Sequence, residues 1–229
     1  MTLRIPASLT RLVLALLLLL ASGGSALAQQ PPQVFFAEAP ALLVRIEGAP
    51  VYRQIRGTGL ERILNTRALI VRDSAGIHYL KALDGWMESY GLLGDWSVSG
   101  VSPFGENTAA ERTALASTVD PLDGGQSSAP AAQPVGLTDR LDENPPAIFV
   151  STTPAALVVT DGPPRYETVA GTSLQRLANS PSTVFLEPTD GEYYGRFDGH
   201  WYRAWTVDGR WQSIANNRLP ADIAKRVAR

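Results

Sequence analysis

The chain contains one segment twice, and this internal repeat constrains the fold more than any other feature of the sequence. Residues 35–65 align without a gap on residues 149–179, and 13 of these 31 positions are identical. A repeat of this length predicts two copies of one small structural unit. After a slip of one residue the match resumes, pairing Gly76 with Gly191, Tyr79 with Tyr194, Trp86 with Trp201, Gly94 with Gly209 and Trp96 with Trp211.

The repeat sets the expected domain organisation. We expect a signal peptide at 1–28, a first β repeat at 29–101, a linker at 102–147, a second β repeat at 148–217 and a short C-terminal helix or tail at 218–229. The residues shared by the two copies are turn formers, aliphatics and aromatics rather than acids, bases or metal ligands. The repeat therefore informs about architecture more than about activity.

The first 28 residues have the pattern of a secretory signal peptide. Arg4 and Arg11 precede the apolar run Leu12–Leu20, and Ala26-Leu27-Ala28 has the A-x-A pattern of a cleavage site. The run is shorter than the ~20 residues of a transmembrane helix, so an uncleaved anchor is the less favoured alternative. Because the chain has no Cys, a lipid anchor on cysteine is excluded. We expect a periplasmic or secreted protein, cleaved after Ala28.

Composition excludes several classes of function. Without residues 1–28 the chain has 18 basic and 22 acidic residues, a net charge of −4, which argues against binding nucleic acid or an anionic membrane. No second long apolar segment follows, so we expect the cleaved protein to be soluble. Without Cys no disulfide forms, and packing alone must stabilise the fold.

Short alternating segments separated by turn signals predict two all-β, antiparallel domains, joined by a partly helical, flexible linker. Within the linker, residues 107–118 favour a short helix capped by Asn107, and residues 120–133 favour a flexible segment. Residues 219–229 fit one short amphipathic helix. The expected strands are 41–47, 51–55, 69–72, 77–83, 86–90 and 96–98 in the first copy, and 156–160, 166–169, 183–186, 193–197, 201–206 and 211–214 in the second.

Residues that carry catalysis are sparse. The chain has two His, His78 and His200, and it contains no zinc-protease, P-loop, nucleophile-elbow or dinucleotide motif. His200 is best explained as a solvated turn residue. Three acidic residues have two explanations, a cluster of carboxylates or, more commonly, the polar residues of β-turns. They are Asp190, Glu192 and Asp198. We therefore expect no enzyme, no cofactor and no metal site.

Aromatic residues are the positive signal. Trp86/Trp96 and Trp201/Trp211 are pairs ten residues apart in the two copies, and we expect these four in the core. If Asp208-Gly209 is a two-residue hairpin turn, Thr206 faces Trp211 and Trp205 faces Gln212. Because side chains alternate between the two faces of a strand, they then fall into two sets, one on each face. The first set is Trp201, Arg203 and Trp205; the second is Tyr202, Ala204, Thr206 and Trp211.

A row of exposed rings beside polar groups suits a sugar, because the apolar face of a pyranose stacks on indole or phenol. The alternative is that all the aromatic side chains are buried and stabilise the core. Trp205, Tyr202 and Tyr90 are the better candidates for exposure. The candidate ligand-binding residues are Trp205, Tyr202, Trp201, Arg203, Tyr90 and Trp86.

The second copy resembles a module of bacterial exported repeat proteins labelled "carbohydrate-binding family V/XII". The likeness is carried by residues 148–162, Gly171-Thr172, Gly199-His200-Trp201-Tyr202, Asp208-Gly209-Arg210-Trp211 and 219–222. Residues 202–209 are similar to the Y-x-A-x-W-T-x-G stretch of chitin-binding modules, which implies that Tyr202 and Trp205 form a ring platform. The first copy has Met87 and Tyr90 at these positions.

Together these features predict a non-catalytic binding protein of the periplasm or cell exterior, with a polysaccharide as the most specific ligand. Two weak sites joined by a flexible linker would then act by avidity if both engage one polymer. A protein-interaction or scaffold module of the cell envelope is the alternative, and an envelope hydrolase is the third.

Overall fold

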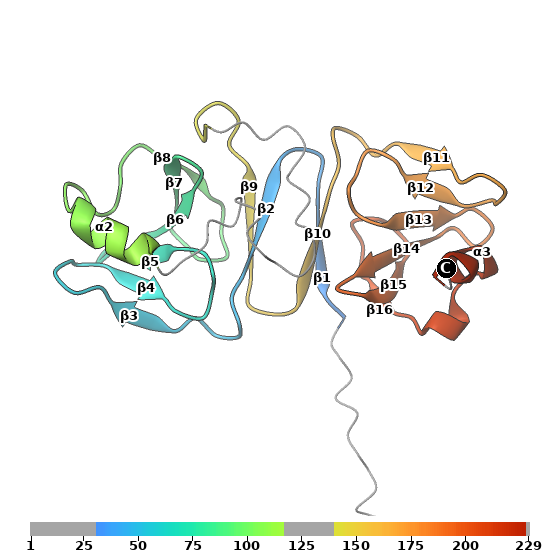
Figure 1. Cartoon of the computed structure of the whole chain (residues 1–229), viewed down its shortest axis with the longest axis horizontal. Helices are drawn as coiled ribbons and strands as arrows, with labels where there is room; N and C mark the ends of the chain where they lie inside the picture. Colours follow the sequence, from blue (N-terminus) through green and yellow to red (C-terminus); the bar gives the residue numbers. More distant parts are fainter. Residues whose placement is uncertain (1–30, 117–139, 228–229) are drawn as a thin grey trace, which may run out of the picture. The chain divides into compact units, whose positions relative to one another are not determined.

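The computed structural model describes residues 31–116 and 140–227. They form two six-stranded antiparallel sheets with a short helix between them in sequence, as Figure 1 shows. The expected fold, two homologous small antiparallel β domains, is confirmed. The expected signal peptide at 1–28 and the expected flexible segment at 120–133 lie outside the described residues.

Each sheet is a meander in which consecutive strands are neighbours. The sheet of copy 1 comprises β3 (Tyr52–Gln54), β4 (Glu61–Ile63), β5 (Ile70–Arg72), β6 (His78–Ala82), β7 (Gly85–Ser89) and β8 (Ser97–Ser99). The sheet of copy 2 comprises β11 (Tyr166–Thr168), β12 (Gln175–Leu177), β13 (Val184–Glu187), β14 (Glu192–Phe197), β15 (His200–Ala204) and β16 (Gln212–Ser213).

A shared asparagine explains part of the sequence identity between the copies. The Asn65 amide donates to the carbonyls of Glu47 and Ala49, both at 2.8 Å, and its oxygen accepts from the Val51 backbone N–H at 2.9 Å. Asn179 makes the same three contacts at the equivalent turn of copy 2. This side chain satisfies backbone groups that the turn leaves unpaired, so both copies retain it.

One face of each sheet is covered by a helix. In copy 1, α2 (Thr108–Leu115) begins after Asn107, whose side chain accepts from the Ala110 N–H as a helix cap. In copy 2, the 3-10 helix η1 (Asn216–Arg218) leads into α3 (Ala221–Val227). Both expected helices are present. The buried residues packed between each helix and its sheet, including those of the helices themselves, are Leu60, Leu69, Val71, Trp86, Phe104 and Ala114 in copy 1, and Leu174, Phe185, Tyr194, Trp201, Leu219 and Ile223 in copy 2.

The first strand of each copy is exchanged between the copies. β1 (Gln33–Ala37) pairs in parallel with β10 (Ala155–Val159), and β9 (Ala147–Ser151) pairs in parallel with β2 (Ala41–Arg45). The registers are equivalent, because Gln33 lies opposite Ala155 while Ala147 lies opposite Ala41. The four strands lie as two pairs in Figure 1.

The exchange completes one hydrophobic core in each copy, which we call the inner core. Val34 and Phe36 of β1 pack into the core of copy 2, and Ile148 and Val150 of β9 pack into the core of copy 1. Only the residues 38–40 join β1 to β2. A parallel pair needs a crossover of about a dozen residues, so β1 cannot pair in parallel with β2 and takes the equivalent strand of the other copy.

Candidate functional site

Two aromatic side chains at equivalent positions are strongly exposed. Tyr90 follows β7 directly and is 87% exposed, and Trp205 follows β15 directly and is 71% exposed. Trp86, Trp201 and Trp211 are buried, as expected of core residues, and Trp96 is half-buried. Trp205 is thus the one strongly exposed tryptophan of the described chain.

The structure separates the six predicted ligand-binding residues into two groups. Trp205, Tyr90 and Arg203 are exposed. Trp201 and Trp86 are buried under the helices. The expectation that Tyr202 is exposed is wrong: Tyr202 is 7% exposed and stacks on Phe197, with ring centroids 5.9 Å apart.

The position of Trp205 follows from a register that the sequence did not predict. Arg203 lies opposite Gln212, whereas a two-residue turn at Asp208-Gly209 would place Trp205 there. The hairpin prediction is therefore wrong. β15 ends at Ala204, and residues 205–211 form a longer loop closed by the Gly209 N–H to Thr206 carbonyl bond, 3.0 Å. The predicted alternation is confirmed within β15, because Tyr202 and Ala204 share one core with Trp211. Thr206, which was predicted to join them, is exposed in the loop.

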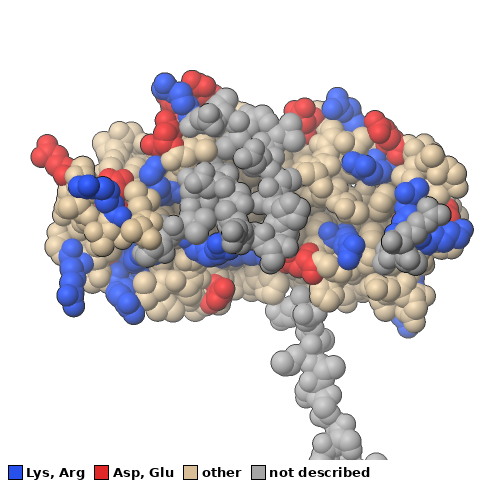
Figure 2. All heavy atoms as spheres, in the orientation of Figure 1, with Lys and Arg blue, Asp and Glu red and all other residues tan. Residues whose placement is uncertain are grey.

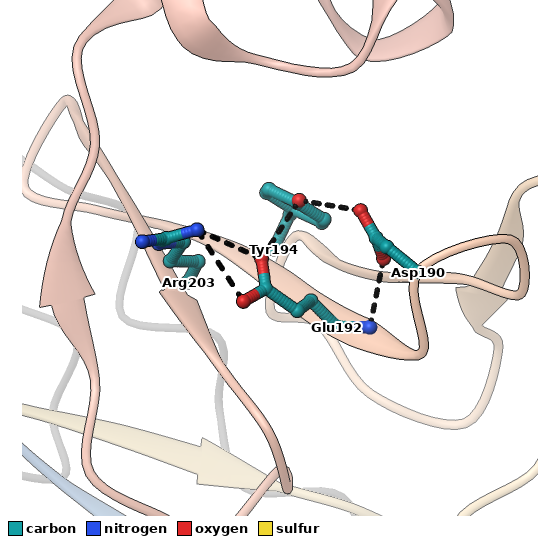
Figure 3. Close-up of polar contacts among 4 residues, drawn as sticks. All are labelled: Asp190, Glu192, Tyr194 and Arg203. Atoms are coloured by element: carbon teal, nitrogen blue, oxygen red, sulfur yellow. Dashed lines mark hydrogen bonds and ion pairs between the residues drawn. The ribbon is translucent and has the colours of Figure 1, made fainter.

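A polar network adjoins the exposed end of β15 (Figure 3). The Arg203 guanidinium contacts the Glu192 carboxylate at 3.2 Å. Tyr194 donates its hydroxyl toward Glu192 Oε2 at 3.0 Å and toward Asp190 Oδ2 at 2.8 Å. Asp190 Oδ1 also accepts from the Glu192 N–H at 2.8 Å. Arg203 precedes Trp205 by two residues, so the network ends close to the exposed indole along the chain.

Protonation in the network follows from burial. Burial raises the pKa of Tyr194 well above its usual value, and its hydrogen bonds to Asp190 and Glu192 add to the shift. The hydroxyl therefore keeps its proton at neutral pH. The hydroxyl has one proton, which the facing oxygens of Asp190 and Glu192 share.

Copy 1 lacks this network. Ile77 stands where copy 2 has Glu192, and Glu88 stands where copy 2 has Arg203. The hydroxyl of Tyr79, which aligns with Tyr194, donates instead to Asp73 at 3.3 Å. The two exposed rings therefore have different polar surroundings.

A shallow pocket of about 430 Å³ lies beside the network, and Asp190 and Tyr194 belong to both. Glu187 at the end of β13 also lines it, together with Arg218 and Asp222 from the C-terminal segment. This volume lies within the range of small-molecule pockets. In the described residues, no group of three or more His, Cys, Asp and Glu is arranged to hold a metal ion.

The carboxylates noted in the sequence are divided between two roles. Asp190 and Glu192 belong to the network, whereas Asp198 pairs with Arg45 of β2 at 3.3 Å. His200 is exposed at the start of β15. Glu187 and Arg218 also line the pocket and were not predicted from the sequence. The alignment offered one signal, because Glu187 aligns with Asp73 and is acidic in both copies.

Both signs of charge occur over each sheet on the face drawn in Figure 2. Within the described ranges, the structure has no helix of the length and apolarity needed to cross a membrane. In comparisons with known proteins, no family model, no curated protein and no solved structure matches the chain.

Proposed function

We propose that the protein is a non-catalytic binding protein of the periplasm or cell exterior, which holds a polysaccharide at Trp205 and the adjoining network of copy 2. The exposed indole is the observation that carries the proposal. An indole left 71% exposed forgoes most of the free energy that its burial would supply. Trp201 and Trp211 already fill the cores of copy 2, so Trp205 is available to a ligand.

The surroundings of Trp205 match what a sugar requires. An aromatic face stacks against the C–H face of a pyranose, and a few fixed polar groups bind its hydroxyls. Arg203 is accessible and is held by Glu192, whose side chain is 10% exposed. A guanidinium fixed in this way loses less conformational entropy on binding than a free one.

The network supports binding rather than hydrolysis. Glycoside hydrolysis needs one carboxylic acid and one carboxylate free to act on the sugar. Glu192 is engaged by Arg203 and Tyr194, and Asp190 is engaged by Tyr194 and a backbone N–H. Both carboxylates thus have structural partners.

The test is a titration of tryptophan emission with chitin oligomers and with peptidoglycan fragments. We expect a saturable shift that Trp205→Ala abolishes and Trp205→Tyr weakens, with unchanged circular dichroism in both variants. Tyr90→Ala is the matched control in copy 1 and leaves the tryptophan signal in place. An unchanged affinity in Trp205→Ala would contradict the proposal, and release of reducing ends would identify a hydrolase instead.

Copy 1 favours a second candidate function, protein interaction in the cell envelope. Tyr90, Leu93 and Val101 are 87%, 66% and 68% exposed, and copy 1 lacks the polar network of copy 2. Exposed apolar side chains without polar anchors are typical of protein contacts rather than sugar sites. Loss of a crosslinked envelope partner in Leu93→Asp, with Trp205→Asp as the matched control, tests this candidate.

A further inference from the structure

The two copies meet through an interface that has the form of a contact between two subunits. β1 pairs with β10 and β9 pairs with β2 in equivalent registers, so the same surface of each copy faces the other. This is an isologous arrangement, the commonest one between identical subunits. The strand pairs satisfy the same backbone groups whether the two copies belong to one chain or to two.

Each copy needs a partner to complete its inner core. Copy 1 supplies Phe36 to the inner core of copy 2, and copy 2 supplies Val150 to the inner core of copy 1. Leu141, which lies ahead of β9, is also buried in the inner core of copy 1, and its N–H donates to Asp84 at 3.0 Å. A copy from the same chain or from a second chain must therefore provide these side chains.

The sizes of the supplied side chains make the interface selective for unlike copies. Phe36 and Val150 occupy equivalent positions of the repeat. Pairing of two copy 1 units would insert Phe36 where the inner core holds Val150, which is 8% exposed, and such overpacking is destabilising. Pairing of two copy 2 units would insert Val150 in place of Phe36 and leave part of that space empty.

Charge adds to this selectivity. Arg45 of β2 pairs with Asp198, in the turn between β14 and β15, at 3.3 Å. The equivalent positions are Val159 in copy 2 and Leu83 in copy 1. Under the two-fold relation, pairing of two copy 1 units would set Arg45 against Leu83. Pairing of two copy 2 units would set Asp198 against the buried Val159. Unlike copies bring the two charges together.

We propose that this interface is a docking surface for a second copy of this chain, in which copy 1 of each chain pairs with copy 2 of the other. The exchanged dimer repeats the contacts of the interface, and swapping of identical elements is a low-cost route to dimers for this reason. Pairing within one chain competes through its high effective concentration. The exchanged dimer therefore forms when chains fold together at high concentration.

The experiment refolds Arg45→Asp and Asp198→Arg chains from urea, separately and together, at one total concentration. Both side chains are more than half exposed, so we expect both variants to fold. Each variant alone has like charges at the contact, within one chain or between two identical chains. A dimer with one chain of each kind regains opposite charges at both contacts. Native mass spectrometry should show mixed dimers in about fivefold excess over like dimers, as two surface ion pairs predict.

The matched control is an ion pair that exchange cannot restore. Arg140 and Asp142 are equally exposed and lie 2.9 Å apart on one segment of the chain. Mixed Arg140→Asp and Asp142→Arg chains should show no excess of mixed dimers. Wild-type chains with light and heavy isotopes, refolded together, should give dimers of mixed mass, which tests the exchange without any substitution. Monomers alone in every sample would overturn the proposal, as would an equal excess in the control pair or no excess with Arg45→Asp and Asp198→Arg.

Discussion

Phe35 of β1 and Phe149 of β9 stack on each other, with ring centroids 4.8 Å apart and planes 26° from parallel. The two residues occupy the same position of the two copies. A residue that meets its own counterpart is the signature of a two-fold relationship, here formed within a single chain. The contact joins the two exchanged strands, and each of these strands carries core residues from one copy into the other.

A substitution in β1 should therefore destabilise the other copy. Phe36 belongs to copy 1 in sequence and packs in the core of copy 2. Since Phe36 is half-buried, we expect Phe36→Ala to cost about 2 kcal/mol, less than full burial would give. Amide hydrogen exchange should accelerate first in β13–β15. Val150→Ala in β9 is the matched control and should accelerate exchange first in β5–β7. Equal acceleration in both copies by both variants would contradict local completion of the cores.

The inner core of copy 2 depends on a glycine. A Cβ on Gly195 would lie 2.6 Å from Phe197 Cζ and 2.9 Å from Trp211 Cζ3. We expect Gly195→Ala to cost about 1–3 kcal/mol by overpacking. Copy 1 has Leu80 and Ala82 at the positions of Gly195 and Phe197. The double variant Gly195→Leu/Phe197→Ala should thus be more stable to urea than Gly195→Leu alone, and no recovery would show that the two copies fill this space differently.

The equivalent tryptophans under the helices should respond differently to the same substitution. Trp86 Nε1 donates to Glu111 of α2 at 3.2 Å, whereas Trp201 Nε1 is buried without a partner among the described residues. Trp86→Phe removes a hydrogen bond, and Trp201→Phe removes an unpaired donor. We expect Trp86→Phe to lower the free energy of unfolding by about 1 kcal/mol more than Trp201→Phe. Equal losses in chemical denaturation would show that the Trp86–Glu111 bond contributes nothing.

Acid should destabilise copy 1 through His78. His78 is 7% exposed, its Nε2 contacts the Tyr52 hydroxyl at 2.9 Å, and burial together with the charge of Arg72 lowers its pKa, against a smaller opposing effect of Asp73. The unfolded chain then takes up a proton at about pH 6.5, before the folded protein does. The free energy of unfolding should fall as the pH drops through about 6.5, until the lower folded pKa is reached.

His78→Tyr tests this origin of the pH dependence. Copy 2 has Tyr193 at the equivalent position, 3.4 Å from the Tyr166 hydroxyl, so the replacement follows a pair that this fold already contains. Urea denaturation from about pH 7.5 to about pH 5 should show a smaller loss of stability in the variant than in the wild-type protein. Identical slopes would assign the loss to other groups.

Stability should distinguish Trp205 from Tyr202. Trp205→Ala should change the free energy of unfolding by less than about 0.5 kcal/mol, because the side chain is mostly exposed. Tyr202→Ala should cost about 3–5 kcal/mol, because its ring stacks on Phe197 in the core. Thermal unfolding of the two variants measures these losses of stability. A large loss in Trp205→Ala would show that Trp205 has a structural role.

Most of the fold was predicted from turn residues and from the alternation of apolar and polar side chains. The fold class and both helices followed from patterns that act within a few positions along the chain, such as the Asn107 cap of α2. The exchange of strands did not, because β1 and β9 contain the same pattern and would contact the same residue types in either copy. The three-residue connections are too short for a parallel pair within one copy. They predict the exchange only if the pairing is already known to be parallel, and the sequence does not show this.

The candidate site was predicted in part, for a related reason. The exposure of Trp205 depends on the loop of residues 205–211, where the strand ends earlier than the Asp-Gly signal suggested. Tyr202 was misjudged because a short likeness to a sugar-binding motif outweighed the alternation that placed it with Trp211. Glu187 and Arg218 come together through the placement of η1 and α3 beside β13, which no local sequence pattern indicates.

Reciprocal strand exchange also sets the order in which the protein can fold during synthesis. β1 is made first, and the strand with which it pairs among the described residues, β10, belongs to the second copy. Copy 1 in turn waits for β9 before its core is complete. Contacts between such distant segments slow folding, and neither half gains a finished core before most of the chain exists. Completion of each core thus couples the folding of one copy to the synthesis of the other.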